Sequence, residues 1–337
     1  MAGYAVGVDI GGTNTKLVLM DDQGVIYQRS TSPTPKDADP NVVVSRIVDV
    51  ASAFVRQAES SGFQLEGVGF AVPHFYEGDD WIQRQTNNMP SLEGFPMYPP
   101  LRQVFGPSIA MINDLSAAGI AEHLFGKGRT YDRMLLIAIG TGISISVVTE
   151  DGLVDYNWGS TGDAGQIIVD PQGLTECTCG GRGCLESIAS APAIRNQALR
   201  EVRRGKQTLL AEIFRDRGDL EAKDVSEAAR AGDAVALDIM GQVGFFLGVA
   251  LTSFLHMFRP SLIVLAGGVG QAGDLLIEPI HRTMSRLASP WYLERLKGIE
   301  VSALGTDGAA MGCASLILYP NRYVRSGTRE GKKEGQT

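Results

Sequence analysis

Cysteine is scarce in this sequence, with four residues among 337. Three of them, Cys177, Cys179 and Cys184, fall close together. This spacing favours a metal-binding knuckle over the dispersed disulfides of a secreted protein. The N-terminus also lacks the basic segment and apolar core of a secretory signal. We therefore expect a cytoplasmic protein with reduced thiols.

Long apolar runs and excess positive charge are also lacking. From composition we expect no run that reaches the roughly 20 residues of a membrane-spanning helix. The net charge of −8 argues against nucleic acid as a main partner. With 44% hydrophobic and 20% charged residues, the composition is typical of a globular protein, and the length suits two domains with large cores.

Glycine, in contrast, is abundant, and a Gly-Gly pair near the start of the chain lies between two apolar runs. Apolar, β-branched runs flank an Asp-x-Gly-Gly-Thr-x-Thr-Lys segment, which predicts a strand, a tight turn and a returning strand. A Gly-Gly turn lets backbone N–H groups point at one anion, and the threonines add hydroxyl donors. Gly-Gly alone favours an ordinary hairpin, but the whole pattern favours a phosphate site. The expected cofactor-binding residues are Asp9, Gly11, Gly12, Thr13, Asn14, Thr15 and Lys16, with Asp9 holding Mg²⁺ through water.

Two later strands also end in glycine. The apolar run 134–139 precedes Gly140, Thr141 and Gly142, and the run 262–266 precedes Gly267 and Gly268. One such loop is weak evidence, because many buried strands end in glycine. Three in one chain suit a nucleotide held from several sides.

The middle of the chain carries the most specific motifs. Asn113-Asp114 follows the apolar run 109–112, and Asp163-Ala164-Gly165-Gln166 comes later. A Cys-x-Cys-Gly-Gly-Arg-Gly-Cys-Leu-Glu element then runs from Cys177 to Glu186. Together with the start motif, these segments resemble the ROK family of sugar kinases and related repressors, over most of the chain.

The resemblance implies an α/β fold of two ribonuclease-H-like domains, as in actin-like ATPases, around a cleft. The alternation of strand and helix patterns agrees with covered sheets. The small domain is expected at 1–118 plus 305–320. The large domain, with the Cys-rich loop and an oligomerisation surface, is expected at 119–304, and 321–337 as a mobile basic tail.

The resemblance also implies transfer of the ATP γ-phosphoryl group, with Mg²⁺, to a hexose hydroxyl, O6 in many relatives, by a homodimer. Asp114 is expected to accept the proton of the attacking hydroxyl. Taken alone, Asn-Asp after a strand is more often a helix N-cap. The expected sugar-binding residues are Asn88, Asn113, Asp114, Asp163, Gln166 and Glu186.

The sequence departs from the family pattern at two places. Asp163 and Gln166 stand where relatives have glutamate and the histidine of a Cys₃His zinc site. Zinc would then bind through Cys177, Cys179 and Cys184 with a water or another side chain. We expect altered discrimination at C1 and C2 of the sugar, unless a water fills the gap and the enzyme remains a plain glucokinase. The second departure, Ile143-Ser144-Ile145-Ser146, replaces several glycines and is expected to tighten the space around the phosphates.

Other functions stay open at this point. A kinase for an N-acetylated or other modified hexose is one, and a non-catalytic sugar-sensing protein is another. A repressor would need a helix-turn-helix segment ahead of Asp9, where only eight residues stand. Residues 268–273 match Gly-x-Gly-x-x-Gly, but no acid follows at the spacing of a dinucleotide-binding site.

Overall fold

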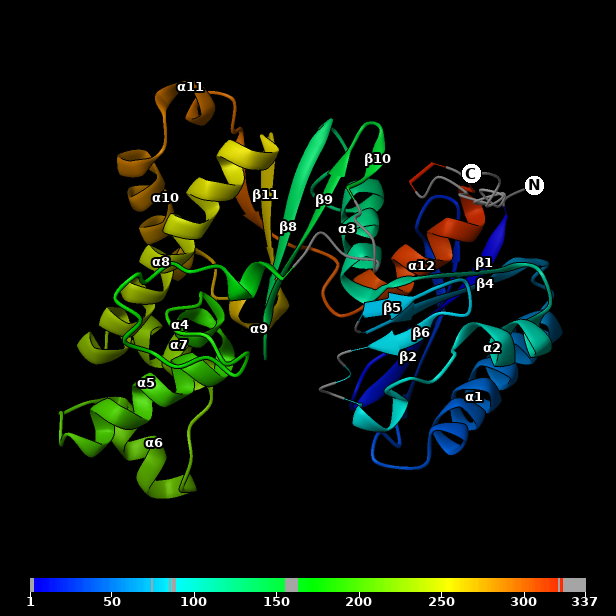
Figure 1. The fold of residues 1–337 in the computed structure, drawn as a ribbon, viewed down its shortest axis with the longest axis horizontal. Helices are drawn as coiled ribbons and strands as arrows, with labels where there is room; N and C mark the ends of the chain where they lie inside the picture. Colours follow the sequence, from blue (N-terminus) through cyan, green and yellow to red (C-terminus); the bar gives the residue numbers. More distant parts are fainter. Residues whose placement is uncertain are drawn as a thin grey trace, which may run out of the picture. The chain divides into compact units, whose positions relative to one another are not determined.

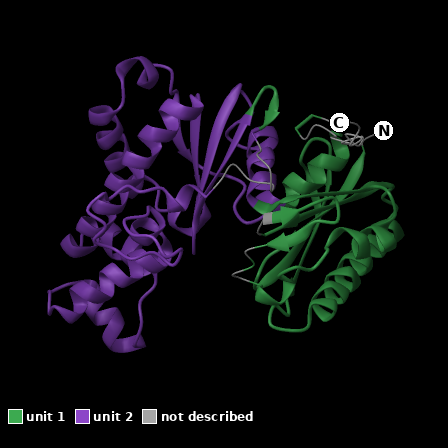
Figure 2. Cartoon of the chain, viewed as in Figure 1, with its two compact units in different colours: residues 1–114, 149–153, 310–337 green, residues 115–148, 154–309 purple. Residues whose placement is uncertain are grey.

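The chain forms two compact units. The computed structural model describes residues 3–73, 75–84, 86, 89–154, 163–320 and 322–323. Unit 1 comprises residues 1–114, 149–153 and 310–337, and unit 2 comprises residues 115–148 and 154–309 (Figure 2). The described residues form two five-stranded sheets with helices, so the expected α/β class is confirmed.

The sheet of unit 1 has the strand order β3-β2-β1-β4-β7. Strands β1, β4 and β7 run parallel, while β2 runs antiparallel to both β1 and β3. A separate hairpin is formed by β5 and β6. The bounds are β1 Tyr4–Ile10, β2 Asn14–Asp21, β3 Ile26–Pro33, β4 Leu65–Val72, β5 Phe75–Glu77, β6 Ile82–Arg84 and β7 Ile109–Asn113. The helices are α1 Pro40–Ser60, the 3₁₀ turn η1 Pro90–Leu92, α2 Tyr98–Phe105 and α12 Gly308–Leu318, which begins in unit 2.

The two faces of this sheet differ because side chains alternate along each strand. Val6 and Val8 belong to the core beneath α1 and α2. Gly7 and Gly69 face the other way, toward residues of α12. Figure 1 shows α12 and α1 on opposite sides of this sheet. A Cβ on Gly69 would lie 2.0 Å from the carbonyl oxygen of Cys313, so α12 can approach the sheet only where the strands carry glycine.

The second sheet has the order β10-β9-β8-β11-β12, with β8, β11 and β12 parallel. Its residues belong to unit 2, except for β10 and the last residue of β9, Thr149, which are assigned to unit 1. Its strands are β8 Arg133–Ile139, β9 Ile143–Thr149, β10 Gly152–Leu153, β11 Leu262–Ala266 and β12 Gly298–Val301. Its helices are α3 Asp114–Phe125, η2 Ala164–Gln166, α4 Glu186–Ala189, α5 Ala191–Arg203, α6 Leu209–Arg217, α7 Ala222–Arg230, α8 Ala234–Phe258, α9 Gly267–Gly270, α10 Asp274–Leu287 and α11 Pro290–Leu293. Helix α8 packs along α10, where Gly244 lies against Pro279 and Gly248 against Thr283.

Helix α8 corrects one expectation from composition. It is 25 residues long, and an 18-residue window of it has a mean hydropathy of 1.8, so by length and composition alone it could span a membrane. Half of that window is buried within the protein, and residues such as Val243, Leu247 and Leu251 belong to the core of unit 2. Its apolar character is that of the core helix expected from its helical spacing.

The expected start of the mobile tail is too early in the chain, because residues 322 and 323 pack against the rest of unit 1. Tyr323 is 5% exposed, and its carbonyl oxygen accepts a hydrogen bond of 3.1 Å from the backbone N–H of Leu153. The guanidinium of Arg322 lies over the ring of Tyr319. The basic tail expected at 321–337 is therefore wrong for Arg322 and Tyr323, while residues 321 and 324–337 lie outside the described part of the chain.

The contact between the strands and α12 predicts a large stability effect. Gly69→Ala should destabilise the protein by about 3 kcal/mol, because the new Cβ meets backbone that cannot move aside easily. Gly241→Ala is the matched control: it lies inside α8 with nothing within 4 Å of a new Cβ, so it should be neutral or stabilising by up to about 1 kcal/mol. Urea unfolding of both variants measures this, and equal midpoints would contradict the close approach.

Candidate functional site

The first glycine-rich segment forms the predicted turn between β1 and β2. Asp9 and Lys16 are cross-strand neighbours. The backbone N–H of Gly11 donates to the carbonyl oxygen of Asn14 at 3.1 Å, and a Cβ on Gly11 would lie 2.8 Å from that oxygen. The turn therefore needs glycine at this position, and it leaves Thr13 exposed at its tip.

Thr15 differs from its expected role as a phosphate donor. It is 3% exposed, and its hydroxyl shares a hydrogen bond of 2.9 Å with the hydroxyl of Thr34, itself 7% exposed. Because side chains alternate along β2, Thr15 points into the unit and holds the turn against the end of β3. The expectation of an open hydroxyl at Thr15 is wrong.

Two acidic residues of unit 1 and one asparagine lie at the same edge of its sheet. Asp9 stands near the end of β1, Asn113 ends β7, and Asp114 opens α3. The intervening strand β4 aligns Ala71 with Asp9 and Val72 with Asn113, so these residues lie at the carboxyl edge of three parallel strands. Ligands bind beyond such edges in α/β proteins.

The environment of Asp9 favours its protonated form. Burial raises the pKa of Asp9 to about 7, the charge of Asp114 adds to this effect, and the charge of Lys16 opposes it. Two carboxylates that repel one another form a donor set suited to a hard cation such as Mg²⁺, which prefers oxygen ligands. Asn88, predicted to contact the sugar, lies outside the described residues.

In unit 2, Glu186 connects two motifs that are separate in the sequence. Its Oε2 accepts a hydrogen bond of 2.9 Å from the backbone N–H of Ile143, directly after the Gly140–Gly142 loop. A Cβ on Gly142 would lie 2.7 Å from this oxygen, and one on Gly165 would lie 3.0 Å from it. The carboxylate thus sits between the glycine loop and the segment 163–166, and both glycines make room for it.

The two substituted positions are exposed. Asp163 directly precedes the short turn η2 and Gln166 is its last residue, and partial desolvation raises the pKa of Asp163. In the other departure, Ile143-Ser144-Ile145-Ser146, the two isoleucines are 2% and 3% exposed and belong to the core of unit 2.

The third glycine motif lies beside the second. A Cβ on Gly267 would approach the carbonyl oxygen of Ile139 to 2.4 Å, and Gly267 has a φ of +78°, so the turn after β11 rests on the end of β8. Both turns border one cavity of about 630 Å³ in unit 2. Its lining comprises Gly140, Thr141, Ala191, Pro192, Arg195, Glu221, Ala222, Lys223, Ser226, Gly268 and Val269.

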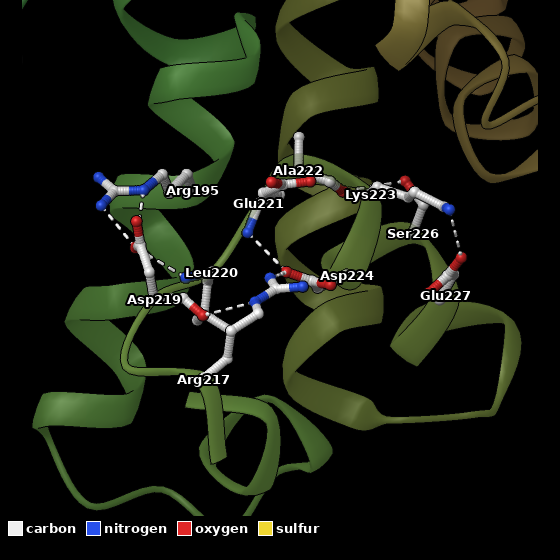
Figure 3. A network of polar contacts seen from close by, with 10 residues as sticks. All are labelled: Arg195, Arg217, Asp219, Leu220, Glu221, Ala222, Lys223, Asp224, Ser226 and Glu227. Carbon is white, nitrogen blue, oxygen red and sulfur yellow. Dashed lines mark hydrogen bonds and ion pairs between the residues drawn. The ribbon is translucent and has the colours of Figure 1, made fainter. Parts of the chain in front are cut away.

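The sequence reasoning missed the parts of this lining on α5 and α7. Their only local signal is that of a helix start, such as Ser190 capping α5 with Pro192 in its first turn. The cations of the lining already have partners: Arg195 pairs with Asp219 at 2.5 Å, and Lys223 with Glu227 at 3.5 Å (Figure 3). Since these cations are paired and most of the remaining lining is uncharged apart from Glu221, the cavity suits a largely uncharged group.

The cysteine knuckle is formed as the spacing predicts. The sulfur atoms of Cys177, Cys179 and Cys184 all lie within 4.8 Å of one another. The backbone N–H of Gly181 donates to Cys179 at 3.4 Å and lowers the pKa of that thiol, while burial raises the pKa of Cys184. These donors fit Zn²⁺ through three thiolates, and no imidazole or carboxylate of the described residues joins them.

The chain matches the model of the ROK family over residues 5–319. It is 31% identical to a glucokinase of Halalkalibacterium halodurans, over 96% of this chain and 98% of that one.

Two solved structures share the fold. A ROK family glucokinase from Streptomyces griseus, in complex with glucose and AMPPNP, is 29% identical with a TM-score of 0.75, over 93% of this chain and 99% of that one. A ROK family transcriptional regulator, a homologue of the Escherichia coli MLC protein, is 26% identical with a TM-score of 0.84, over 94% of this chain and 77% of that one. Enzymes and regulators are thus both among the similar proteins.

The pKa of Asp9 predicts how stability depends on pH. Because its folded pKa of about 7 lies above the ordinary value of 3.8, the folded state holds the proton more tightly, and stability is lost as pH rises from about 4 to 7. Asp9→Asn removes this loss. Without nucleotide or Mg²⁺, its advantage over the unmodified protein should be small at pH 4 and reach on the order of 1–4 kcal/mol at pH 8.

Thermal melts across this pH range make the comparison. Asp37→Asn, which removes an exposed carboxylate from the same unit, is the control and should show no such trend. A constant offset between Asp9→Asn and the unmodified protein at every pH would contradict the prediction.

The knuckle predicts a metal content. Protein purified without chelator should contain Zn²⁺, but should lose it to a chelator more readily than a site with four protein ligands. Cys177→Ser should lower the zinc content, whereas Cys313→Ser, at a buried thiol in unit 1, should not. Elemental analysis measures both. Zinc that resists chelation would mean that a fourth protein ligand is present.

Proposed function

The chain belongs to the ROK family, and we propose that it is an ATP-dependent sugar kinase that transfers the γ-phosphoryl group to a hexose hydroxyl, O6 by resemblance. The observation that carries the proposal is the placement of Asp9 and Asp114 at one strand edge, close enough for each charge to affect the other, beside the glycine turn of β1 and β2. An anion-binding turn and a carboxylate at a helix start are the parts that phosphoryl transfer to an alcohol requires.

In this proposal the turn of unit 1 binds phosphate. The backbone N–H of Gly12 and the hydroxyl of exposed Thr13 donate to phosphate oxygens, while Gly11, whose N–H bonds to the carbonyl oxygen of Asn14, closes the turn that presents them. Lys16, across the strand pair from Asp9, adds positive charge. Asp9 would hold Mg²⁺ through water, and the ion, when bound, supplies charge neutralisation on the phosphates.

Asp114 acts as the general base. Its carboxylate accepts the proton of the attacking sugar hydroxyl as the new O–P bond forms. Asn113, 8% exposed at the end of β7, orients a neighbouring hydroxyl through its amide. Asn88 is proposed to contribute a further amide contact.

The cavity of unit 2 takes the nucleoside in this proposal. Its paired cations and its size suit a purine and ribose rather than a triphosphate. Thr141 and Gly142 contact the phosphates through their backbone N–H groups, while the N–H of Gly140 donates to the carbonyl oxygen of Gly142 at 2.9 Å and closes the loop. Gly267 and Gly268 contact the nucleoside. The Streptomyces griseus glucokinase, which shares the fold, was crystallised with AMPPNP, and this agrees with a nucleotide site in the present chain.

Asp163, Gln166 and Glu186 complete the proposed sugar contacts. Glu186 is held in place by the N–H of Ile143. Asp163 is one methylene shorter than the family glutamate, and Gln166 offers an amide instead of an imidazole. Both changes affect the C1–C2 side of the sugar by resemblance, so an N-acetylated or otherwise modified hexose is the alternative substrate to glucose. The proposal includes the zinc knuckle and the cytoplasmic homodimer that the resemblance implies.

A non-catalytic, sugar-sensing protein is the second candidate. The presence of a ROK family transcriptional regulator among the solved structures that share the fold supports it. The presence of Asp9, Asp114 and Glu186 in the sequence supports the kinase instead. A protein that binds sugars without releasing ADP, and that shifts DNA in a gel, would support this candidate.

Replacement of the proposed base tests the kinase directly. The unmodified protein with Mg-ATP should release ADP with at least one member of a panel of glucose, mannose, 2-amino and 2-acetamido sugars and 1,5-anhydroglucitol. Asp114→Asn should lower kcat by about 10²–10⁴-fold, because the hydroxyl loses its proton acceptor, while sugar binding weakens only modestly. Asp238→Asn removes an exposed carboxylate of α8, outside the proposed site, and serves as the control. Full activity in Asp114→Asn would exclude this role.

A further inference from the structure

The wall of the nucleoside cavity depends on the short connection between α6 and α7. Helix α6 ends at Arg217, and Gly218 follows it with a φ of +78°. Three residues later, Glu221, Ala222 and Lys223 line the cavity at the start of α7. A connection this short transmits any movement of the end of α6 to the cavity wall.

Two carboxylates hold this connection in place (Figure 3). Asp219 accepts from Arg195 of α5 at 2.5 and 3.0 Å and from the backbone N–H of Leu220 at 2.7 Å. Asp224 accepts from Arg217 and, at 2.6 Å, from the backbone N–H of Glu221. The backbone just before and at the start of α7 is therefore fixed by charge-assisted hydrogen bonds, which are stronger than neutral ones.

The pair of Arg217 and Asp224 differs from an ordinary surface ion pair. The side chain of Asp224 is 9% exposed, whereas that of Arg217 is 48% exposed. Loss of the arginine would leave a buried carboxylate with a backbone N–H but without its cation, an arrangement that favours movement of the helix start. The apolar face of α7, with Val225 and Ala229, stays in the core, so the movement is confined to its first turn.

Neither Arg217 nor Asp224 belongs to the cavity lining, although Glu221 between them does. We propose that Arg217 and Asp224 are positioning residues that set the affinity for the nucleoside part of the nucleotide by fixing the first turn of α7. The inference rests on the proposed function, because it assigns the cavity to a nucleoside. It predicts that these residues affect nucleotide binding and leave sugar and phosphate binding unchanged.

The test compares Arg217→Ala, Arg217→Lys and Asp224→Asn with a control. Arg204→Ala removes another ion-paired arginine of unit 2, 68% exposed and bonded to Glu201 at 2.6 Å, outside the cavity lining. Arg217→Ala should raise KM for ATP about tenfold with little change in kcat or in KM for the sugar. Arg217→Lys keeps a cation and should recover most of the affinity, and Arg204→Ala should match the unmodified protein.

Inorganic tripolyphosphate separates positioning from general damage. It has no nucleoside, so its inhibition constant should stay within about twofold in Arg217→Ala while KM for ATP rises. Equal losses for ATP and tripolyphosphate, or an unchanged KM for ATP in Arg217→Ala, would overturn the inference. Asp224→Asn changes a buried side chain, so the circular dichroism and melting temperature of this variant are measured first. If Asp224→Asn does not fold, the variants of half-exposed Arg217 decide the result.

Direct binding distinguishes this inference from the kinase proposal. Titration with the fluorescent N-methylanthraniloyl derivative of ATP, without sugar, needs no turnover. The inference holds if the unmodified protein binds this probe and Arg217→Ala weakens that binding about tenfold. If, in addition, no sugar supports ADP release, the kinase proposal fails while the inference stands. If the unmodified protein does not bind the probe, both fail.

Discussion

The arrangement of the site depends on parallel strands that end at a common edge. In unit 1, β1, β4 and β7 run parallel, and Asp9 and Asn113 stand where β1 and β7 end. In unit 2, β8 and β11 run parallel, and the glycine turns after them touch. Because parallel strands place their carboxyl ends side by side, residues more than a hundred positions apart become neighbours. Each unit therefore gathers its glycine-rich turns at one sheet edge.

Close packing at these edges has an electrostatic consequence. Helix α12 lies against Gly7 and Gly69. Asp9, two residues after Gly7 on β1, is partly buried and lies close enough to Asp114 to be affected by its charge. Two carboxylates in such surroundings disfavour full ionisation, so the pKa of Asp9 rises. A bound cation would relieve this repulsion. A site of this kind is less stable when empty than when occupied, as is common where function requires concentrated charge.

In unit 2 the charged groups beside the cavity are paired instead. Arg195 and Lys223 border an otherwise largely apolar cavity, and Asp219 and Glu227 neutralise them. Glu186 similarly uses one oxygen to bind the backbone of Ile143 and joins the glycine loop to the segment around Gly165. These contacts fix the walls of the site before a ligand arrives, which lowers the entropy lost on binding.

The sequence by itself determined the family, the α/β class, the β1–β2 turn, the knuckle and the long core helix α8. Each of these features is indicated by short patterns within one segment of the sequence, such as a glycine pair, a cysteine spacing or an apolar periodicity. Only the tertiary structure decided that Thr15 pairs with Thr34, that Ile143 and Ile145 enter the core, and that α5 and α7 supply the cavity wall. Such facts depend on which face of a strand is buried and on which distant segments meet it. No short stretch of sequence holds that information, because burial is set by the packing of the whole unit.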